Sequence, residues 1–255
     1  MAKKITIVNQ KGGVGKTTTA VNLSASLAVL GKKTLLIDTD PQGNATSGLG
    51  FVKHELKFTI YEVLTDQCDV EEAILNTDIE DLHLIGANVN LAGATVELVD
   101  IPDREYIMKK KLEKLNGRYD YIILDSPPSL GLLTINNLVA SDSVLIPLQC
   151  EYYALEGMSE LLDTIYLVQK NLNPELQLEG ILMTMYDSRT NLSKQVVEEV
   201  RSYFGEKVYK TVIPRNVKLG EAPSFGKPVV LYMPSASGAR AYLELAKEVI
   251  SHEEG

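Results

Sequence analysis

Short apolar runs alternate with amphipathic stretches along most of the chain. The apolar runs have the length of buried strands, and they are residues 4–9, 33–38, 82–87, 119–125, 143–149, 178–186 and 207–213. Most of the stretches between them have the apolar spacing of helices. Strands and helices that alternate in this way are typical of a mostly parallel, twisted sheet with helices on both faces. The pattern therefore predicts an α/β fold.

The first and last predicted helices carry clear apolar stripes. Residues 16–30 place Ala20 and Leu23 on one face, and a helix over residues 237–252 has a similar stripe that we expect to dock on the core. No linker rich in Gly, Ser or Pro interrupts the pattern, and neither a repeat nor a low-complexity tract is present. We therefore expect a single domain over residues 1–255.

Composition is that of an ordinary soluble globular protein, with 45% hydrophobic and 23% charged residues. Cys68 and Cys150 lie far apart, which supports neither a disulfide framework nor a zinc site and indicates a reducing cytosol. The apolar stretch in MAKKITIVNQ is only as long as a strand, so it lacks the hydrophobic region of a signal peptide. No apolar run reaches the roughly 20 residues of a membrane-spanning helix. We expect a cytoplasmic protein without a membrane partner.

The net charge of −9 is distributed unevenly. Residues 55–105 hold thirteen acidic residues against two basic ones, whereas residues 189–240 hold nine basic residues against four acidic ones. A net negative charge argues against a nucleic-acid partner, and the simplest interpretation of the basic segment is a set of solvated helix faces. The basic segment becomes informative only if another feature indicates a polyanion.

Residues 9–18, NQKGGVGKTT, are similar to a phosphate-binding loop of the pattern G-x-x-x-x-G-K-[ST]. The end of the pattern, GKT, is present, but Gln10 occupies the place of its first glycine. A second lysine, Lys11, stands where the pattern needs none. Because the loop follows a predicted strand and precedes a predicted helix, its context favours phosphate binding over a glycine-rich turn with an incidental lysine.

The residue types of this loop suit phosphate binding. Gly12, Gly13 and Gly15 allow successive backbone N–H groups to converge on phosphate oxygens, and the start of the helix adds its positive dipole end. We expect Lys16 to neutralise the outer phosphates and the Thr17 hydroxyl to hold a Mg²⁺ ion that bridges them.

Acidic residues end two of the predicted strands, where α/β sheets place their ligand chemistry. Asp125 ends YDYIILD and is expected beside the loop as a magnesium partner, and Asp38 and Asp40 follow the second strand in LLIDTDPQG. The turn at Pro41 leaves open whether both of these face the nucleotide. Each acid alone could be a helix cap or a turn former, but together with the loop they favour a nucleotide site.

Several stretches carry a family resemblance. KGGVGKTT, with a lysine directly before the first glycine, is similar to the deviant phosphate loop (deviant Walker A) of the ParA/MinD group of ATPases. DTDPQGNATSGLG, DSPPSLG, PLQCEYYALEG and VIPRNVKLGEAPSFGKPV resemble specifically the ParA/Soj chromosome-partitioning ATPases, and the stretches span residues 5–232. The resemblance implies a P-loop NTPase fold and a Mg²⁺-dependent ATPase with ATP and Mg²⁺ as its cofactors.

The resemblance also implies roles for individual residues. It implies a nucleotide-sandwich homodimer in which Lys11 of one subunit reaches the phosphates bound by the other, as an arginine finger would. It ties Asp40 to the attacking water, and Asp38 and Asp125 to the magnesium environment. The implied nucleotide contacts are Lys11, Gly12, Gly13, Val14, Gly15, Lys16, Thr17 and Thr18 in the loop, and Pro214 and Asn216 on the adenine side.

The same resemblance implies that DNA is a binding partner. ParA/Soj dimers bind double-stranded DNA without sequence preference and release it after hydrolysis stimulated by a ParB-type centromere-binding protein. The resemblance therefore implies a nucleoid-associated protein with Arg189, Arg215 and Lys218 as DNA contacts. Lys218 stands where close relatives can have arginine, and a lysine keeps the charge but loses the bidentate fork. An ATP-dependent dimer doubles the basic surface, so an acidic protein can still bind DNA.

Three other functions fit the sequence less well. A membrane-cycling ATPase of the MinD type needs a basic amphipathic tail, whereas this chain ends in SHEEG. An electron-transfer ATPase like the nitrogenase iron protein needs cysteines for a cluster at its dimer interface, and Cys68 and Cys150 do not stand in that family's sequence contexts. A metabolic kinase needs an acceptor pocket that the sequence does not identify. Chromosome and plasmid cargo are not distinguished.

Overall fold

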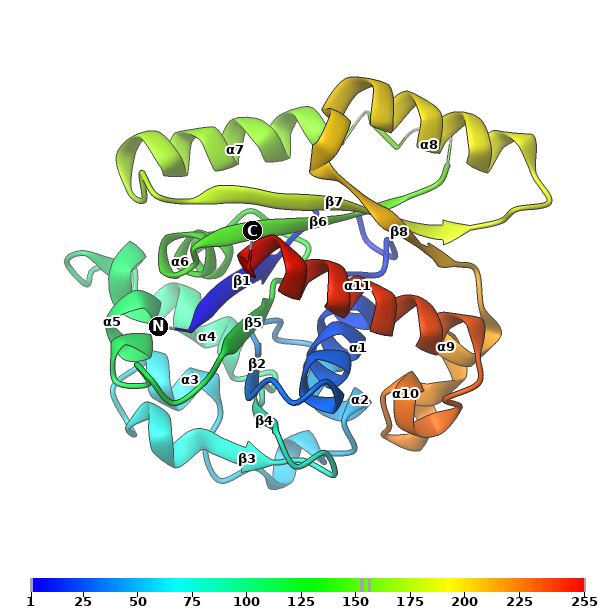
Figure 1. Ribbon diagram of the computed structural model, residues 1–255. Coiled ribbons are helices and arrows are strands. Elements are labelled where there is room, and N and C mark those ends of the chain that lie inside the picture. The colour runs from blue at the N-terminus through cyan, green and yellow to red at the C-terminus, as the bar shows by residue number, and fades with distance from the viewer. Residues whose placement is uncertain (1, 152–153, 156, 255) are drawn as a thin grey trace.

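An eight-stranded sheet runs through the centre of the protein (Figure 1). The structure is a computed structural model, and it describes residues 2–151, 154–155 and 157–254. The strands lie in the order β3-β4-β2-β5-β1-β6-β7-β8, and all neighbours are parallel except β3 and β4. Their bounds are β1 Lys3–Ile7, β2 Thr34–Asp38, β3 Ile74–Asn76, β4 Leu82–Ile85, β5 Tyr121–Asp125, β6 Ser143–Gln149, β7 Gln177–Tyr186 and β8 Val208–Pro214.

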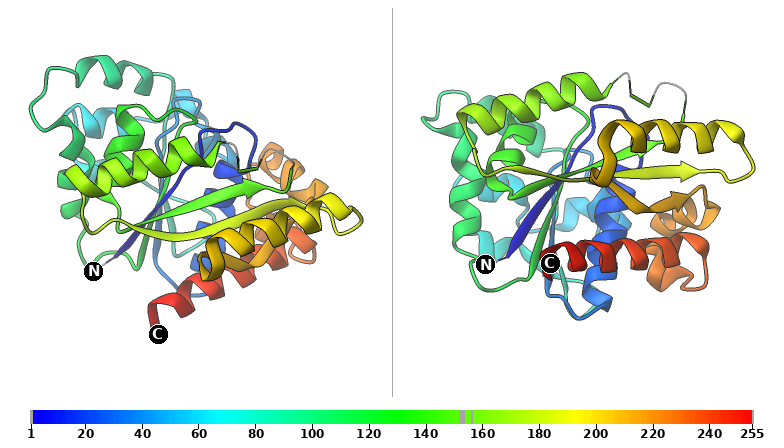
Figure 2. Two further views of the ribbon diagram at one scale, coloured as in Figure 1. Left: turned by 90° about the horizontal axis from the view of Figure 1, so that it is seen from above. Right: turned by 45° about the horizontal axis from the view of Figure 1, so that its top comes forward.

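Helices cover both faces of the sheet, as the two views of Figure 2 show. One face packs against α1, α2, α10 and α11, and the other against α3 to α8. The predicted mostly parallel α/β fold is therefore confirmed. The helices are α1 Lys16–Val29, α2 Asn44–Gly48, α3 Ile60–Leu64, α4 Leu91–Glu97, α5 Ile107–Glu113, α6 Leu132–Ala140, α7 Met158–Asn171, α8 Asn191–Phe204, α9 Val217–Glu221, α10 Val229–Tyr232 and α11 Ser237–Glu254.

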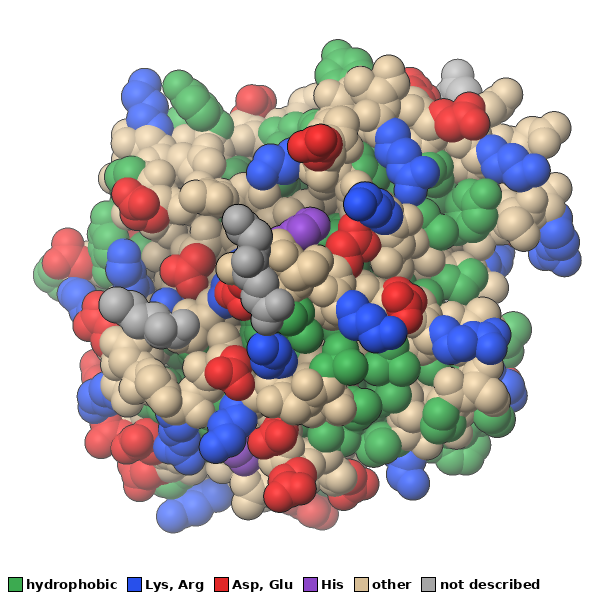
Figure 3. All heavy atoms as spheres, in the orientation of Figure 1, with side chains coloured by type: hydrophobic (Ala, Val, Ile, Leu, Met, Phe, Trp, Pro, Cys, Tyr) green, Lys and Arg blue, Asp and Glu red, His purple; other side chains and the backbone are tan. Residues whose placement is uncertain are grey.

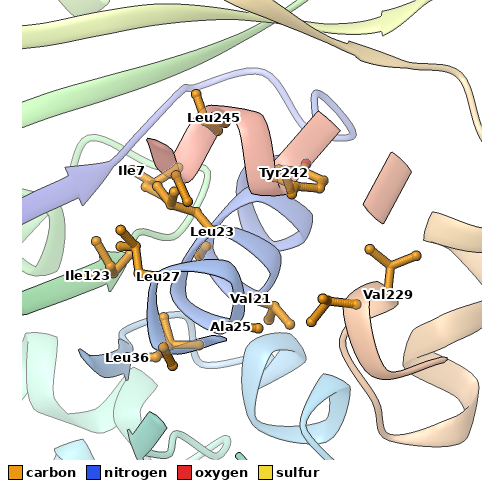
Figure 4. Close-up of a cluster of buried hydrophobic side chains, with 14 of the residues drawn as sticks. Ile7, Val21, Leu23, Ala25, Leu27, Leu36, Ile123, Val229, Tyr242 and Leu245 are labelled. Carbon is orange, nitrogen blue, oxygen red and sulfur yellow. The ribbon is translucent and has the colours of Figure 1, made fainter. Parts of the chain in front are cut away.

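The central strands are apolar throughout because each of their faces is buried. Leu36 and Ile123 pack with Leu23 and Leu27 of α1, as Figure 4 shows. The residue before Leu36 in β2, Leu35, points to the other face and belongs to the cluster beneath α3, α4 and α5. This two-sided burial explains why the strands appear in the sequence as continuous apolar runs.

The predicted strands correspond to β1, β2 and β4 to β8, and the first and last predicted helices correspond to α1 and α11. No predicted strand corresponds to β3, which has three residues and pairs antiparallel at the edge of the sheet. Part of the stretch PLQCEYYALEG, residues 152, 153 and 156, lies outside the described residues. No helix in the described part of the chain is long and apolar enough to cross a membrane.

The topology brings three loops to one edge of the sheet. Because β2, β5 and β1 are adjacent and parallel, the loops that follow these three strands leave the same end of the sheet side by side. In register, Asp125 is paired with Ile7 of β1 and with Asp38 of β2. The residues predicted to bind phosphate and magnesium therefore meet where an α/β sheet changes its direction of winding.

A carboxylate from α11 covers part of the free edge of β8. Glu248 accepts hydrogen bonds from the backbone N–H groups of Lys210 and Thr211, at 2.7 and 3.0 Å. Unpaired N–H groups at a sheet edge invite pairing with another strand, and Glu248 satisfies two of them. Figure 1 shows α11 lying along this side of the sheet.

Candidate nucleotide site

The loop between β1 and α1 is fixed at both ends by side chains. Asn9 donates from Nδ2 to the carbonyl of Pro147 at 2.8 Å and accepts from the backbone N–H of Lys11 at 3.0 Å. The Thr184 hydroxyl donates to the carbonyl of Val14 at 2.8 Å. These bonds hold the loop against β6 and β7, so its conformation is set before any ligand binds.

The inner surface of the loop is built to accept an anion. Gly13 and Gly15 have φ values of 75° and 91°, which side-chain-bearing residues rarely adopt. A Cβ atom at Gly12 or Gly13 would meet no described atom within 4 Å, so the space above the loop is open. Within the described structure, α1 has neither a side-chain cap nor an acidic residue in its first turn. Its first N–H groups are thus available to phosphate oxygens.

The two lysines of the loop occupy different environments. Lys16 is only 7% exposed, and its Nζ donates to the backbone carbonyl of Lys11 at 3.1 Å. Burial lowers the pKa of Lys16, while the charges of Asp125 and Asp40 act in the opposite direction. The side chain of Lys11, in contrast, is exposed. Lys16 is therefore buried within the loop, and Lys11 is exposed on its outside.

Asp38 is fully buried and well bonded. One carboxylate oxygen accepts from the backbone N–H of Asp40 at 3.1 Å, and the other accepts from the N–H and the hydroxyl of Thr46, at 2.8 and 2.7 Å. Burial raises the pKa of Asp38 to about 6, although these hydrogen bonds oppose the shift. Both oxygens of the Asp38 carboxylate thus already accept hydrogen bonds, from Asp40 and from Thr46 of α2.

Asp125 is equally buried but lacks such partners. Neither of its carboxylate oxygens makes a hydrogen bond of regular geometry with a described residue. Burial, followed by the charge of Asp38, raises the pKa of Asp125 well above its usual value, and the nearby Thr17 hydroxyl and Lys16 ammonium oppose this. A buried carboxylate with free oxygens beside the start of α1 has the chemistry of a divalent-cation ligand.

The described residues hold no ready-made metal cage, because no group of three or more His, Cys, Asp or Glu side chains comes together. This fits Mg²⁺, which is usually held by one or two carboxylates together with phosphate oxygens and water. Asp38 and Asp125 are register partners at the ends of β2 and β5, and the Thr17 hydroxyl lies close to Asp125. A metal there would need a bound phosphate to complete its coordination.

Asp40 lies in the turn that follows β2 and is 8% exposed. Its Oδ1 accepts from the backbone N–H of Gln42 at 2.9 Å, and its carbonyl accepts from the N–H of Gly43 at 2.8 Å. Lys53 donates from Nζ to the carbonyl of Gln42 at 2.6 Å. Asp40 is thus held at the rim of the site, with its second carboxylate oxygen available.

A cavity of about 430 Å³ joins the loop to the end of β8. Pro214 and Asn216, predicted on the adenine side, line this cavity together with Gly15 and Thr18 of the phosphate loop. Asn216 also caps α9, accepting from the backbone N–H of Lys218 at 2.9 Å. The cavity therefore connects the predicted phosphate and adenine contacts in one continuous space.

The basic residues predicted to contact DNA lie near the ends of β7 and β8. Arg189 has a side chain that is 85% exposed and makes a bidentate pair with Asp187, at 2.9 and 2.7 Å. This guanidinium lowers the pKa of Asp187 to about 2. Arg215 is exposed, and Lys218 pairs with Glu221 at 2.7 Å. Figure 3 shows basic side chains along the part of the surface over α8 and α9.

Sequence reasoning missed several residues that hold the site. Thr46, Thr184 and Asn9 fix Asp38 and the phosphate loop through the hydrogen bonds given above. For Thr184 a signal was present, because it is a lone hydroxyl in the apolar run LEGILMTMY. Thr46 had no such signal, since its partner lies at the end of a different element.

The chain is similar in sequence to known proteins over nearly its whole length. The AAA domain family matches residues 2–178 of the chain. The sporulation initiation inhibitor protein Soj of Bacillus subtilis is 61% identical over 252 residues, which cover 99% of this chain and 100% of that protein. The chromosome partitioning protein ParA of Myxococcus xanthus is 55% identical, over 98% of this chain and 88% of that protein.

A solved structure is similar over the whole chain. The crystal structure of a protein described as cobyrinic acid a,c-diamide synthase from Mycobacterium smegmatis, with a bound ATP analogue and magnesium, has a TM-score of 0.88 and 39% sequence identity. The match covers 100% of this chain and 97% of that one. The fold of this chain is thus one that holds ATP analogues and magnesium in another protein.

Proposed function

We propose, since the chain belongs to the Soj/ParA family of chromosome-partitioning ATPases, that it uses ATP hydrolysis as a timer for DNA binding. With ATP bound, two copies associate and bind double-stranded DNA without sequence preference. A ParB-type centromere-binding protein then stimulates hydrolysis, and the DNA is released. The cycle takes place in the cytoplasm, on the nucleoid, and moves a chromosome or a plasmid.

The residues of the site fit ATP and Mg²⁺. The open glycine loop and the uncapped start of α1 suit the phosphates, and the cavity that reaches Pro214 and Asn216 suits the base and sugar. Thr17 and Asp125 would hold Mg²⁺, with Asp38 beside them. Mg²⁺ at this point supplies positive charge that neutralises the phosphates during phosphoryl transfer.

Lys16 would serve the nucleotide of its own subunit. Its ammonium group now bonds the carbonyl of Lys11, and phosphate oxygens would replace this carbonyl as stronger, charged acceptors. Burial lowers the pKa of Lys16 because it disfavours the charged form of the side chain. The negative charge of the phosphates would stabilise that charged form.

Lys11 would serve the nucleotide of the second subunit. Its side chain is exposed, whereas its backbone N–H and carbonyl make the hydrogen bonds to Asn9 and Lys16 within the loop, so the ammonium group is accessible to a second copy. A lysine supplied across an interface adds positive charge where negative charge develops, and makes hydrolysis depend on association. ATP bound between the two copies also stabilises the dimer by mass action.

Asp40 would orient the attacking water. Its carboxylate lies at the rim of the site and keeps one oxygen free after bonding Gln42. A carboxylate in this position can accept a hydrogen bond from a water molecule that approaches the outermost phosphate. Asp40 is also near enough to Lys16 for its charge to influence that lysine.

DNA binding would use Arg189, Arg215 and Lys218, which lie at the same end of the sheet as the nucleotide. Two of these cations pair with acidic residues in the single chain, and DNA phosphates would compete with those acids. Binding of this kind weakens steeply as salt rises, because phosphate contacts release counterions.

One observation supports this function most directly: a buried Lys16 and an exposed Lys11 flank the same open glycine loop. The test measures ATP hydrolysis with DNA and a ParB-type protein, separately and together. Stimulation by both that exceeds the sum of the separate effects supports partitioning. Indifference to both leaves an ATPase without that role, and DNA binding of equal strength without nucleotide contradicts the timer.

A further inference from the structure

Asn137, in the middle of α6, is fully buried and bonds to two hydroxyl groups. Its Nδ2 donates to the hydroxyl of Thr39 at 2.6 Å and to the hydroxyl of Ser126 at 3.0 Å. Its backbone carbonyl accepts from the hydroxyl of Thr6 at 3.1 Å. One residue of α6 thus contacts three segments that are far apart in the sequence.

Each of these segments carries part of the nucleotide site. Thr6 lies in β1, which leads into the phosphate loop, and Thr39 separates Asp38 from Asp40. Ser126 directly follows Asp125. The side-chain amide therefore ties together the ends of β2 and β5, which carry the acids of the site, while the backbone carbonyl joins them to β1.

The direction of the hydrogen bonds is determined by the neighbouring groups. The Thr39 hydroxyl donates its one hydrogen to the carbonyl of Asp125 at 2.6 Å, and the Thr39 N–H donates to the same carbonyl at 3.0 Å. The hydroxyl must then accept from Asn137, so the atom that faces it is the amide nitrogen. An amide offers two donors at this point, and both are used.

We infer that Asn137 is a positioning residue for ATP hydrolysis, which holds the Asp38–Asp40 turn in register with Asp125. This inference rests on the proposed function. Residues that orient the ligands of a metal site commonly affect its affinity or activity by roughly 10-fold to 100-fold when they are removed. Asn137 would act through Thr39 and Ser126, without touching ATP or Mg²⁺ itself.

The neighbouring residue of α6 provides a matched control. Asn136 is also buried, but it bonds away from the site: it accepts from the backbone N–H of Met108 at 3.1 Å and donates to the carbonyl of Arg104 at 2.8 Å. The same substitution at this position removes a buried amide from the same helix. It should cost stability without disturbing the acids.

The test compares Asn137→Ala with Asn136→Ala in the full-length protein. We measure kcat and KM for ATP, the melting temperature, and the Mg²⁺ concentration that half-saturates binding of a fluorescent ATP analogue. Asn137→Ala should lower kcat by about 10-fold to 100-fold with KM changed by less than about threefold, and should raise the half-saturating Mg²⁺ concentration. Asn136→Ala should lower the melting temperature to a similar extent but leave the other quantities near wild type.

A second pair keeps the inference testable if Asn137→Ala fails to fold. Thr39→Val keeps the shape of the side chain but removes its hydroxyl, whereas Thr39→Ser retains the hydroxyl. We expect Thr39→Val to lower kcat as Asn137→Ala does, and Thr39→Ser to keep at least about half of it. Equal kcat values for Asn137→Ala and Asn136→Ala, or a fully active Thr39→Val, would overturn the inference. Failure of the proposed function would appear differently, as a wild-type protein without ATP hydrolysis.

Discussion

The ammonium group of Lys16 donates a hydrogen bond to the backbone carbonyl of Lys11, 3.1 Å away, while the side chain of Lys11 is exposed. The two lysines of the loop are therefore joined through the backbone but separated in their charges. The charge of Lys16 is buried inside the loop, whereas the charge of Lys11 is accessible from solvent. This division predicts two different losses when each lysine is removed.

Lys16→Ala should abolish productive ATP binding, weakening it by about 100-fold or more, because a buried charged contact to the phosphates is lost. Lys11→Ala should leave the ATP affinity unchanged within about threefold and prevent ATP-dependent dimerisation. Titration with a fluorescent ATP analogue and analytical ultracentrifugation measure the two effects. A Lys11→Ala protein that still dimerises with ATP would show that Lys11 does not act across an interface.

Asp40→Asn should slow ATP hydrolysis by about 100-fold to 10,000-fold, the range for loss of a group that assists proton transfer. The amide oxygen can still accept from the N–H of Gln42, so the turn should keep its shape. The variant should accumulate as an ATP-bound dimer on size-exclusion chromatography. Single-turnover hydrolysis at the wild-type rate would remove Asp40 from the reaction.

The buried acids predict how stability depends on pH. Burial raises the pKa of Asp38 to about 6 and that of Asp125 well above its usual value, so the folded protein binds more protons than the unfolded one. Stability contributed by the protonated acids is then present below about pH 4 and is lost as pH rises through about 6 and beyond.

Asp125→Asn should therefore flatten the fall in stability between pH 5 and pH 8 in the nucleotide-free protein, a fall of up to about 1.4 kcal/mol per pH unit for each proton. Urea unfolding at a series of pH values measures this slope. Asp163→Asn, an exposed acid on α7, serves as the control and should leave the slope unchanged. An identical slope in Asp125→Asn and wild type would contradict the buried, unpartnered state of this carboxylate.

The pair of Arg189 with Asp187 predicts opposite effects on DNA binding. Arg189→Glu should lose DNA binding while ATP-dependent dimerisation survives. Asp187→Asn should release the guanidinium and tighten DNA binding by about threefold, since the acid no longer competes with phosphate. Fluorescence anisotropy with a labelled duplex, at several salt concentrations, tests both. Loss of dimerisation in Arg189→Glu would make its assignment to DNA wrong.

The sequence predicted a mostly parallel sheet and all of its strands except β3, because buried parallel strands are apolar on both faces and therefore stand out as continuous runs. The glycine loop between β1 and α1 could also be predicted, since Gly13 and Gly15 have φ values that only glycine adopts easily. The edge strand β3 could not be predicted, because three residues are too few to show a periodic pattern of apolar positions. Its pairing with β4 depends on the tertiary structure.

Contacts between segments that are far apart in the chain could not be predicted from the sequence either. Asp38 and Asp125 looked alike as acids at strand ends, yet the structure gives Asp38 three donors and leaves Asp125 with none of regular geometry among the described residues. The difference arises from Thr46, eight residues further along the chain. The same holds for Asn137, which appears in the sequence as one of three polar residues, with Thr134 and Asn136, in an otherwise apolar helix.

The carboxylate of Glu248 sets a limit on how copies of this protein can join. With the N–H groups of Lys210 and Thr211 already occupied, this border of the sheet offers a poor start for strand-by-strand growth into a fibre. In the proposed cycle, copies that gather on DNA must later disperse, and ATP hydrolysis could not reverse growth of this kind. Glu248 thus opposes a route of assembly that would not depend on nucleotide.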